Sequence, residues 1–189
     1  VTGGNGFIGS ALIKYLVNIP GIQVVGMVRS SKYIFPNADI EFRVGEIVSS
    51  DKSFVDMSDI DVVIHTAGRA HILDAQSKEE DDAFFSINTD ATIDLANFAA
   101  ASGVKRFIFL SSIKVIGETT CLGAPFTINS VENPQCAYGL SKYQAEKGLS
   151  KINHETSLET AIVRIPLVYG PGVKGNLNTL IKILSLGFP

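Results

Sequence analysis

The sequence predicts an α/β fold built on a doubly wound, mostly parallel sheet with helices on both faces. Short apolar runs alternate with longer segments of helical character along all 189 residues. This alternation is typical of parallel sheets, because each crossover between parallel strands needs a helix-length connection. A glycine-rich turn opens the first helical segment, where a fold of this kind binds ligands. No internal repeat or low-complexity linker interrupts the pattern.

The individual elements follow from the same pattern. The apolar runs predict strands over residues 22–28, 42–47, 61–66, 106–110 and 160–166. The intervening segments predict helices over residues 7–17, 80–101, 138–153 and 177–186. Ser102 and Gly103 are a good stop for the second of these helices. Because loops that follow parallel strands share one edge of the sheet, we expect Gly3, Gly68, Ser112 and Pro166 to lie there.

The glycine turn has the spacing G-x-x-G-x-x-G, with glycines at positions 3, 6 and 9. Small residues allow a tight turn and let a pyrophosphate approach the backbone. The helix that begins near Phe7 points its N-terminal amides at that anion. A glycine-rich loop without a ligand is the alternative, since such a pattern alone is weak evidence. The apolar run 22–28 completes a βαβ unit and favours dinucleotide binding.

A second pattern, Tyr138-x-x-x-Lys142, carries proton-transfer chemistry. Helical residues four apart face the same side, so the ammonium is expected to lower the tyrosine pKa from its ordinary value of about 10. The tyrosine then takes a proton from a hydroxyl as hydride leaves the same carbon, or returns it in reduction. Ser111 and Ser112 could hydrogen-bond the same oxygen. A solvated helix face and an ordinary serine turn are the alternatives, and the two motifs together favour catalysis.

Composition narrows the classes of partner. The chain is 46% hydrophobic and 19% charged with a formal net charge of −3, which gives no reason to expect nucleic acid. No apolar run approaches the roughly 18 residues of a membrane span. Cys121 and Cys136 lie far apart, so they are predicted to be free thiols in a reducing cytosol, and no metal is expected. The histidines at positions 65, 71 and 154 form no ligand cluster, and His65 is predicted to be a satisfied core or edge residue.

Taken together, these motifs resemble the extended short-chain dehydrogenases/reductases, and among them the NAD(P)-dependent nucleotide-sugar epimerase/dehydratase family of UDP-glucose 4-epimerase-like proteins. The matching segments are Thr2-Gly3-Gly4, His65-Thr66-Ala67-Gly68, Asn88, Ser111-Ser112, Tyr138-x-x-x-Lys142, Arg164-Ile165-Pro166 and Tyr169-Gly170-Pro171-Gly172. The resemblance implies a Rossmann-type domain over residues 1–170, with Ser112, Tyr138 and Lys142 as the catalytic triad.

The resemblance also implies which residues contact the cofactor. Glu46 and Ile47 would lie by the adenine, Asn88 would support the strand beside the cofactor, and Lys142 would bind the nicotinamide ribose. The full implied set is Gly3, Gly6, Phe7, Ile8, Gly9, Arg29, Glu46, Ile47, Thr66, Ala67, Gly68, Asn88, Tyr138, Lys142 and Pro166. Ser112 and Asn176 would contact the substrate.

Two departures from the family pattern narrow the function. NAD-binding members carry an acidic residue at the end of the second strand, where this chain has Val28 followed by Arg29. An arginine could accommodate a 2′-phosphate there, or could be a solvated loop residue, so NAD and NADP both remain open. Ile113 and Lys114 stand where dehydratases of the family carry Asp-Glu. The lack of both carboxylates disfavours dehydration.

The resulting expectation is a cytoplasmic nucleotide-sugar epimerase that transiently oxidises the sugar, at C4, and acts on a UDP-hexose or UDP-N-acetylhexosamine. An NADPH-dependent 4-ketoreductase is the alternative, favoured by Arg29. A non-catalytic NAD(P)-sensing module is disfavoured, because a sensor does not need the catalytic triad.

The sequence also allows predictions about the first and last residues of the chain. Val1 and Thr2 are read as the tail of a first strand, and residues 171–189 as the start of a substrate-binding region that is truncated here. Family resemblance further implies a homodimer.

Overall fold

The computed structural model describes residues 1–34, 40–48, 56–69, 77–173 and 176–187. Within these ranges the strands are β1 (Val24–Val28), β2 (Ile40–Val44), β3 (Val62–His65), β4 (Arg106–Ser112) and β5 (Glu159–Ile165), and all their pairings are parallel. β1 pairs with β2, and β4 lies between β3 and β5. Thr2 joins the two groups by pairing with Met27 of β1 and His65 of β3. The Val1–Thr2 segment therefore occupies the central place predicted for a first strand.

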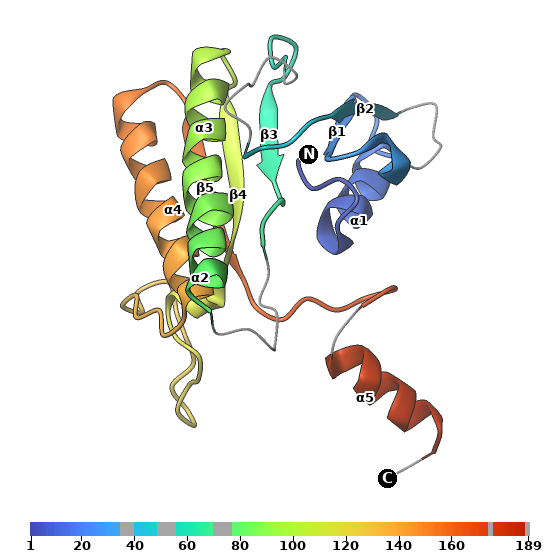
Figure 1. Ribbon diagram of the computed structural model, residues 1–189, viewed down its shortest axis with the longest axis vertical. Coiled ribbons are helices and arrows are strands. Elements are labelled where there is room, and N and C mark those ends of the chain that lie inside the picture. The colour runs from blue at the N-terminus through green and yellow to red at the C-terminus, as the bar shows by residue number, and fades with distance from the viewer. Residues whose placement is uncertain (35–39, 49–55, 70–76, 174–175, 188–189) are drawn as a thin grey trace.

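Helices surround this sheet (Figure 1). They are α1 (Phe7–Leu16), α2 (Lys78–Phe84), the π-helical turn η2 (Phe85–Asp90), α3 (Ala91–Ala101), α4 (Ala137–Glu155) and α5 (Asn176–Ser185), with short 3₁₀ turns η1 (Ser31–Tyr33) and η3 (Ile113–Val115). α4 packs against β4 and β5 with α3 alongside it, whereas α1 packs beside β1 (Figure 1). The predicted α/β class and parallel sheet are confirmed.

The single helix predicted over residues 80–101 is wrong in one respect, because α2 and α3 are separated by η2. A π turn inserts an extra residue into the helical repeat, and an apolar pattern read at 3.6 residues per turn does not reveal it. Ser77 caps the start of α2, where its Oγ accepts from the backbone N–H of Glu80 at 3.3 Å. The remaining predicted elements exist, with ends displaced by a few residues.

Apolar side chains cover the sheet on both faces. The main cluster packs strand residues against α3 and α4, and includes Val63, Phe107, Phe109, Leu95, Ala99, Ala145 and Leu149. A second cluster joins Ile13 of α1 to Val24 and Ile40. Val24 and Met27, three apart on β1, belong to different clusters because side chains alternate between the faces of a strand. The two clusters therefore lie on opposite faces, as a doubly wound sheet requires.

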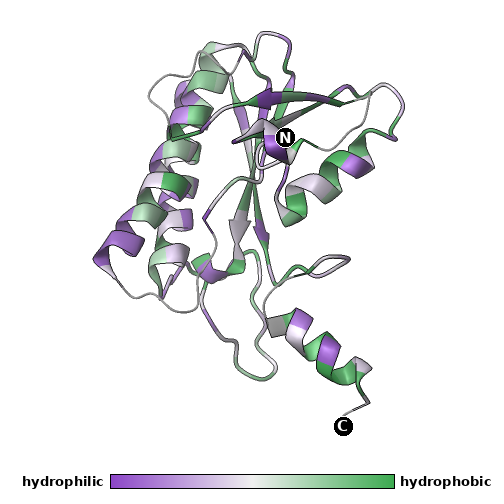
Figure 2. Ribbon diagram, turned by 45° about the vertical axis from the view of Figure 1, so that its right-hand side comes forward, coloured by the Kyte–Doolittle hydropathy of each residue, from purple (hydrophilic) through white to green (hydrophobic). Residues whose placement is uncertain are grey.

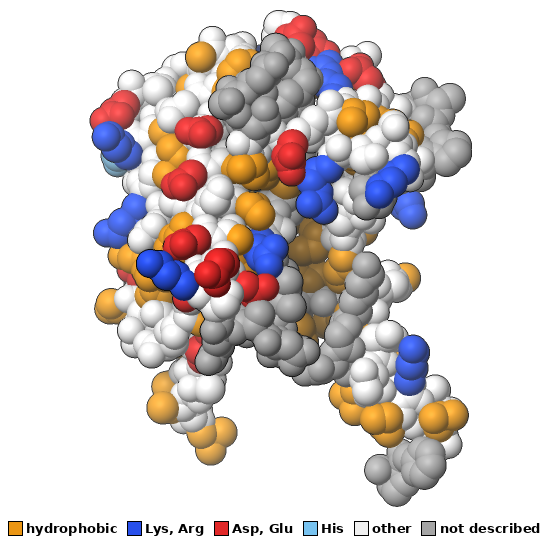
Figure 3. Space-filling model, in the orientation of Figure 1, with side chains coloured by type: hydrophobic (Ala, Val, Ile, Leu, Met, Phe, Trp, Pro, Cys, Tyr) orange, Lys and Arg blue, Asp and Glu red, His pale blue; other side chains and the backbone are white. Residues whose placement is uncertain are grey.

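Two segments stand away from this core. α5 is separated from the sheet and mixes apolar and polar residues along its length (Figure 2). The connection from η3 to α4 projects from the carboxyl end of the sheet and exposes Leu122, Ile128 and Val131 (Figures 1 and 3). None of the helices within the described ranges is both long enough and apolar enough to cross a bilayer.

His65 ends β3 inside the core, as predicted for a satisfied core residue. Its side chain is fully buried, with Nδ1 2.7 Å from Thr2 Oγ1 and Nε2 3.0 Å from Thr92 Oγ1. The ring stacks on Phe109 with centroids 5.8 Å apart. Burial, followed by the charge of Lys142, lowers the pKa of His65 to about 3 from its ordinary 6.5.

Acid should therefore destabilise the protein through His65. Between pH 6.5 and pH 3 the unfolded chain binds a proton at this histidine and the folded chain does not, so stability falls as the pH falls. Lowering the pH from 7 to 5 should cost wild type about 2 kcal/mol more than His65→Gln, measured by urea unfolding. The control His154→Gln, at an exposed position, should keep the wild-type pH dependence. An equal pH dependence in His65→Gln would contradict this role.

Candidate active site

The glycine turn forms a cradle between α1 and the end of β3. Gly3 has φ +66, and a Cβ on it would lie 2.9 Å from the backbone of Ala67. Gly9 packs even more closely, since a Cβ there would lie 2.2 Å from the carbonyl oxygen of Gly3. Gly6 precedes the first residue of α1 and has no side chain to cover the helix terminus. The backbone of this turn is thus open to a close-fitting anion.

A cavity of about 380 Å³ extends from this cradle along the carboxyl ends of β1, β2 and β3. Eight of the predicted cofactor residues line it: Gly3, Gly6, Arg29, Glu46, Ile47, Thr66, Ala67 and Gly68. The sequence interpretation missed other lining residues, among them Asn5, Arg69 and Ile87. Arg69 also has its Nε buried without a partner among the described residues.

Ser112 and Tyr138 meet at the adjacent strand end. Ser112 closes β4, and its Oγ accepts from the backbone N–H of Lys114 at 3.2 Å. Tyr138 stands in the first turn of α4, beside Phe84, with ring centroids 6.0 Å apart. The Ser112 side chain lies close enough to Tyr138 to lower the pKa of its hydroxyl. The two groups can therefore share one substrate oxygen.

The expectation that Lys142 lowers the pKa of Tyr138 is wrong in this structure. Burial raises the pKa of Tyr138, and the opposing influences are the hydrogen bond from Ser112 and then the charge of Lys114. Lys114 was missed as a functional candidate; its Nζ lies 2.8 Å from Glu118 Oε2, and this pairing raises the pKa of Lys114. Spacing on a helix places two residues on one side but does not direct a long lysine chain.

Lys142 instead points across the sheet edge. Its Nζ donates to the carbonyl of Leu110 at 3.1 Å and lies 4.5 Å from the centre of the Phe109 ring. A Cβ added to Gly68 would come within 3.1 Å of this Nζ, so the ammonium lies against a residue that lines the cavity. Burial lowers the pKa of Lys142 to about 8, and Glu146 opposes that shift.

Asn88 lies in η2, fully buried, and connects β3 to α4. Its Oδ1 accepts from the backbone N–H of Arg69 at 2.8 Å, and its Nδ2 donates to the Arg69 carbonyl and to Ser141 Oγ, each at 3.1 Å. Ser141 directly precedes Lys142. Asn88 therefore fixes the position of the Lys142 backbone relative to the segment that follows β3. π turns occur often at functional sites.

The other predicted residues lie outside the cavity. Phe7, Ile8 and Gly9 begin α1 behind the cradle, and Pro166 follows β5 at an exposed position. Asn176 begins α5, and its side chain falls outside what the structure describes. Both cysteines are free, as predicted. No group of residues suited to a metal occurs within the described ranges, and His71 lies outside them.

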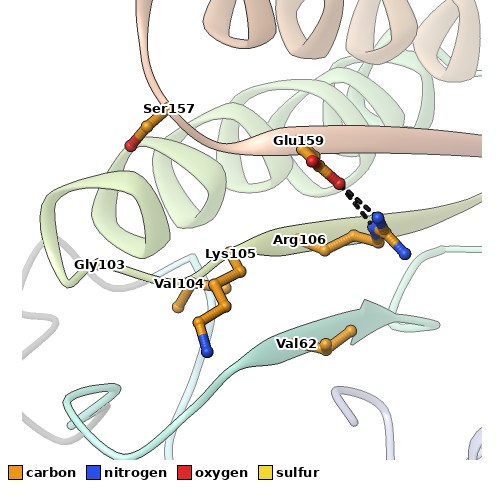
Figure 4. A pocket seen from close by; sticks show the side chains of 7 residues that line it. All are labelled: Val62, Gly103, Val104, Lys105, Arg106, Ser157 and Glu159. Carbon is orange, nitrogen blue, oxygen red and sulfur yellow. Dashed lines mark hydrogen bonds and ion pairs between the residues drawn. The ribbon is translucent and has the colours of Figure 1, made fainter.

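A second hollow, of about 500 Å³, lies at the opposite end of the strands (Figure 4). Val62, Arg106 and Glu159 contribute to it, and the arginine is paired with the glutamate (Figure 4). Lys105 is likewise paired, with Asp61 at 2.7 Å. Both cations of this hollow are thus paired with carboxylates, whereas the candidate catalytic side chains lie at the carboxyl ends of the strands.

Known proteins share both this sequence and this architecture. The family described as "NAD dependent epimerase/dehydratase family" matches residues 1–186. A UDP-glucose 4-epimerase of Vibrio cholerae is 40% identical over 189 residues, which are 100% of this chain and 57% of the relative. A putative UDP-glucose 4-epimerase of Methanocaldococcus jannaschii is 31% identical over 90% of this chain and 55% of its own length.

Among solved structures, the UDP-glucuronic acid 4-epimerase of Bacillus cereus in complex with NAD superposes with a TM-score of 0.83. It is 25% identical, and the match covers 100% of this chain and 63% of that one. The chain thus spans little more than half the length of the curated relatives it matches. By the extent of the family match and the identity to these relatives, the chain belongs to the NAD-dependent epimerase/dehydratase family.

Proposed function

We propose that this chain carries the cofactor-binding and catalytic part of a UDP-hexose epimerase that uses NAD and oxidises the sugar transiently at C4. The observation that carries the proposal is the meeting of Ser112 and Tyr138 beside Lys142, next to a cavity that ends in a glycine cradle. Residues 1–170 would form the cofactor-binding domain, and residues 171–189 would begin the substrate-binding region of a homodimeric enzyme.

The residues around the cavity fit a dinucleotide. The cradle at Gly3 and Gly6 offers backbone where a Cβ would obstruct a pyrophosphate. Arg69, which lines the cavity, adds a cation near the end of β3. Lys142 borders the cavity with a cation suited to ribose hydroxyls.

Gly3, Gly6 and Lys142 would hold NAD, and the bound cofactor would supply the hydride-transfer chemistry that a transient oxidation of the sugar needs. Tyr138 is placed to take the proton of the sugar hydroxyl and to give it back to the keto oxygen. Ser112 hydrogen-bonds that oxygen and orients it towards Tyr138. Lys142 holds the ribose and, through Ser141 and Asn88, keeps a defined position relative to the end of β3. The carboxylates that a dehydration would need are replaced by Ile113 and Lys114.

The epimerase assignment is tested by converting UDP-glucose that carries deuterium at C4. The epimerase that contains this chain should form UDP-galactose that retains the deuterium, without net consumption of nicotinamide, because the same hydride leaves and returns. UDP-N-acetylglucosamine should be tested in parallel, since the sugar is part of the proposal. Absence of a C4 epimer from both sugars would contradict the assignment.

An NADPH-dependent 4-ketoreductase is the second candidate, and Arg29 favours it. Arg29 lines the cavity in an exposed position and forms no ion pair with any residue that the structure describes. Its guanidinium is suited to a ribose 2′-phosphate. A reductase would consume NADPH in proportion to product, which distinguishes it from the epimerase in the same assay.

Replacing Arg29 by alanine decides between the cofactors. If the guanidinium contacts a 2′-phosphate, Arg29→Ala should weaken NADP by about 1.5–3 kcal/mol and leave NAD nearly unchanged. Calorimetric titration of both cofactors measures this. Lys14→Ala, which removes a cation from the exposed side of α1, is the matched control. Equal losses of affinity for NAD and NADP in Arg29→Ala would show that Arg29 does not recognise the 2′-phosphate.

A further inference from the structure

A line of buried hydrogen bonds crosses the core behind the glycine cradle. It runs from Thr92 of α3 through His65 of β3 to Thr2, and all three residues are buried. His65 Nε2 lies 3.0 Å from Thr92 Oγ1, and His65 Nδ1 lies 2.7 Å from Thr2 Oγ1. Thr2 directly precedes Gly3. These bonds therefore connect a core helix to the segment that leads into the glycine turn.

Thr2 also contacts the two residues that follow β3. Its Oγ1 accepts from the Ala67 N–H at 3.2 Å, and its carbonyl oxygen accepts from Thr66 Oγ1 at 2.6 Å. Thr66 and Ala67 line the cofactor cavity together with Gly3. A Cβ added to Gly3 would lie 2.9 Å from the Ala67 backbone, so the two segments pack closely. The position of Thr2 thus sets how the glycine turn meets the end of β3.

The partners of the Thr2 hydroxyl determine which ring nitrogen of His65 carries the hydrogen. Burial lowers the pKa of His65 to about 3, so the ring is neutral at physiological pH and has a single N–H. Because the Ala67 N–H is itself a donor, His65 Nδ1 is the only acceptor that contacts Thr2 Oγ1 among the residues that the structure describes. A buried donor without an acceptor is strongly disfavoured. Nδ1 therefore accepts from Thr2, and Nε2 carries the hydrogen and donates to Thr92.

Two aromatic side chains of β4 hold the imidazole in this orientation. The His65 ring centroid lies 5.6 Å from that of Phe107 and 5.8 Å from that of Phe109, and both phenylalanines are fully buried. Turning the ring over would place carbon atoms opposite the two threonines and break both hydrogen bonds. His65 thus presents a fixed acceptor to Thr2.

We propose that His65 is a positioning residue for the cofactor cradle, in which Nδ1 directs the Thr2 hydroxyl hydrogen away from Ala67 so that the hydroxyl oxygen receives the Ala67 N–H. An apolar residue at position 65 could fill the core but could not direct this hydroxyl. The inference rests on the proposed function only for the identity of the ligand, NAD. The tautomer and the Ala67 contact follow from hydrogen bonds within the protein.

The tautomer is tested in the wild-type enzyme that contains this chain, by ¹⁵N–¹H correlation spectra of protein labelled in its histidine rings. The His65 ring signals are assigned through its backbone resonances. Near neutral pH, Nε2 should have the chemical shift of a protonated nitrogen and Nδ1 that of an unprotonated one. The reverse pattern, with the hydrogen on Nδ1, would overturn the proposal. Because this measurement needs no substitution, it decides even if variants at position 65 fail to fold.

The positioning role is tested by calorimetric titration of NAD into three variants. His65→Leu removes the acceptor and should weaken NAD binding about three- to tenfold, the loss expected for one hydrogen bond. Thr2→Val removes the hydroxyl and should cause a similar loss. The double variant should lose no more than Thr2→Val alone, because His65 acts through Thr2. Wild-type affinity in His65→Leu, or losses that add in the double variant, would refute the proposal.

Thr92→Val is the matched control, because it removes the other partner of His65 and leaves the cavity lining intact. It should lose stability in urea unfolding and keep an NAD affinity close to that of wild type. A loss of NAD affinity as large as that in Thr2→Val would assign the effect to a loosened core and contradict the positioning role.

His65→Asn should restore part of what His65→Leu loses. The amide oxygen of asparagine is bonded to Cγ, as Nδ1 is, so it can accept from Thr2, whereas the shorter side chain does not extend to Thr92. NAD affinity in His65→Asn should therefore be closer to wild type than in His65→Leu. Equal losses in the two variants would show that an acceptor at this place is not what matters.

Hydrogen exchange of the Ala67 amide separates this inference from the proposed function. Without any ligand, the Ala67 N–H should exchange faster in His65→Leu and Thr2→Val than in wild type and Thr92→Val. If wild type does not bind NAD, the proposed function fails, and the tautomer and the exchange rates still decide the inference. If wild type binds NAD and His65 carries its hydrogen on Nδ1, the inference alone fails.

Discussion

Tyr138→Phe should lose about 10²–10⁴-fold in turnover while NAD binding stays within a few-fold of wild type. The substitution removes the hydroxyl whose pKa Ser112 lowers and keeps the ring that packs against Phe84. Fold and cavity should therefore survive, and the loss should appear in kcat. Steady-state kinetics with a UDP-hexose, combined with calorimetric titration of NAD, measures both quantities.

Tyr143→Phe is the matched control for this experiment. Tyr143 lies on the same helix, half-buried, beside Lys147 rather than the catalytic serine. Its variant should turn over at nearly the wild-type rate. Wild-type turnover in Tyr138→Phe would refute the assignment of Tyr138 as the proton-transfer group.

Gly9→Ala should disrupt the cradle and weaken NAD binding by tenfold or more. The added Cβ would lie 2.2 Å from the carbonyl oxygen of Gly3 and 2.9 Å from its carbon, and neither backbone atom can rotate aside. Overpacking of this kind costs about 1–3 kcal/mol, more than the roughly 1 kcal/mol that alanine gains over glycine in a helix. A loss of about 1.4 kcal/mol at the cradle corresponds to tenfold in NAD affinity.

Gly148→Ala provides the comparison, because it is also a glycine inside a helix. Its added Cβ would come within 2.4 Å of Ile93 Cδ1 and 2.6 Å of Ile93 Cγ1, which are side-chain atoms rather than backbone. Because a side chain can shift where the Gly3 backbone cannot, Gly148→Ala should cost less stability than Gly9→Ala in urea unfolding. If Gly9→Ala keeps stability and NAD affinity as well as Gly148→Ala does, the close packing of the cradle is not required for NAD binding.

The parts of this site that the sequence predicts are those determined by local spacing. The spacing of the glycines predicts the cradle at Gly3 and Gly6. The predicted ends of the parallel strands place Ser112 and Gly68 at the same edge of the sheet. The direction of Lys142 could not be forecast, because a lysine chain is steered by tertiary partners such as the Leu110 carbonyl. Burial, likewise a property of the assembled core, reversed the expected pKa shift of Tyr138.

The partners of His65 are hidden from sequence for a related reason. Thr2 and Thr92 lie far from His65 along the chain, and only the pairing of Thr2 with β1 and β3 and the packing of α3 bring them to its ring. The π turn at Asn88 is hidden differently, since its extra residue leaves the surrounding apolar pattern helical. The apolar run that ends in His65 was the one visible signal, and it identifies a core residue without revealing its partners.

The connection between η3 and α4 is held at both ends next to the proposed catalytic groups, and this has an evolutionary consequence. It leaves η3 just after Ser112 and enters α4 just before Tyr138, and its final stretch is held where the Asn133 N–H donates to the Val115 carbonyl at 3.0 Å. Doubling the length of a flexible loop costs only about 0.6 kcal/mol of closure entropy. Insertions at the exposed tip near Leu122 can therefore lengthen this loop without displacing Ser112 or Tyr138. Changes in the length of this loop should therefore leave the positions of Ser112 and Tyr138 unchanged.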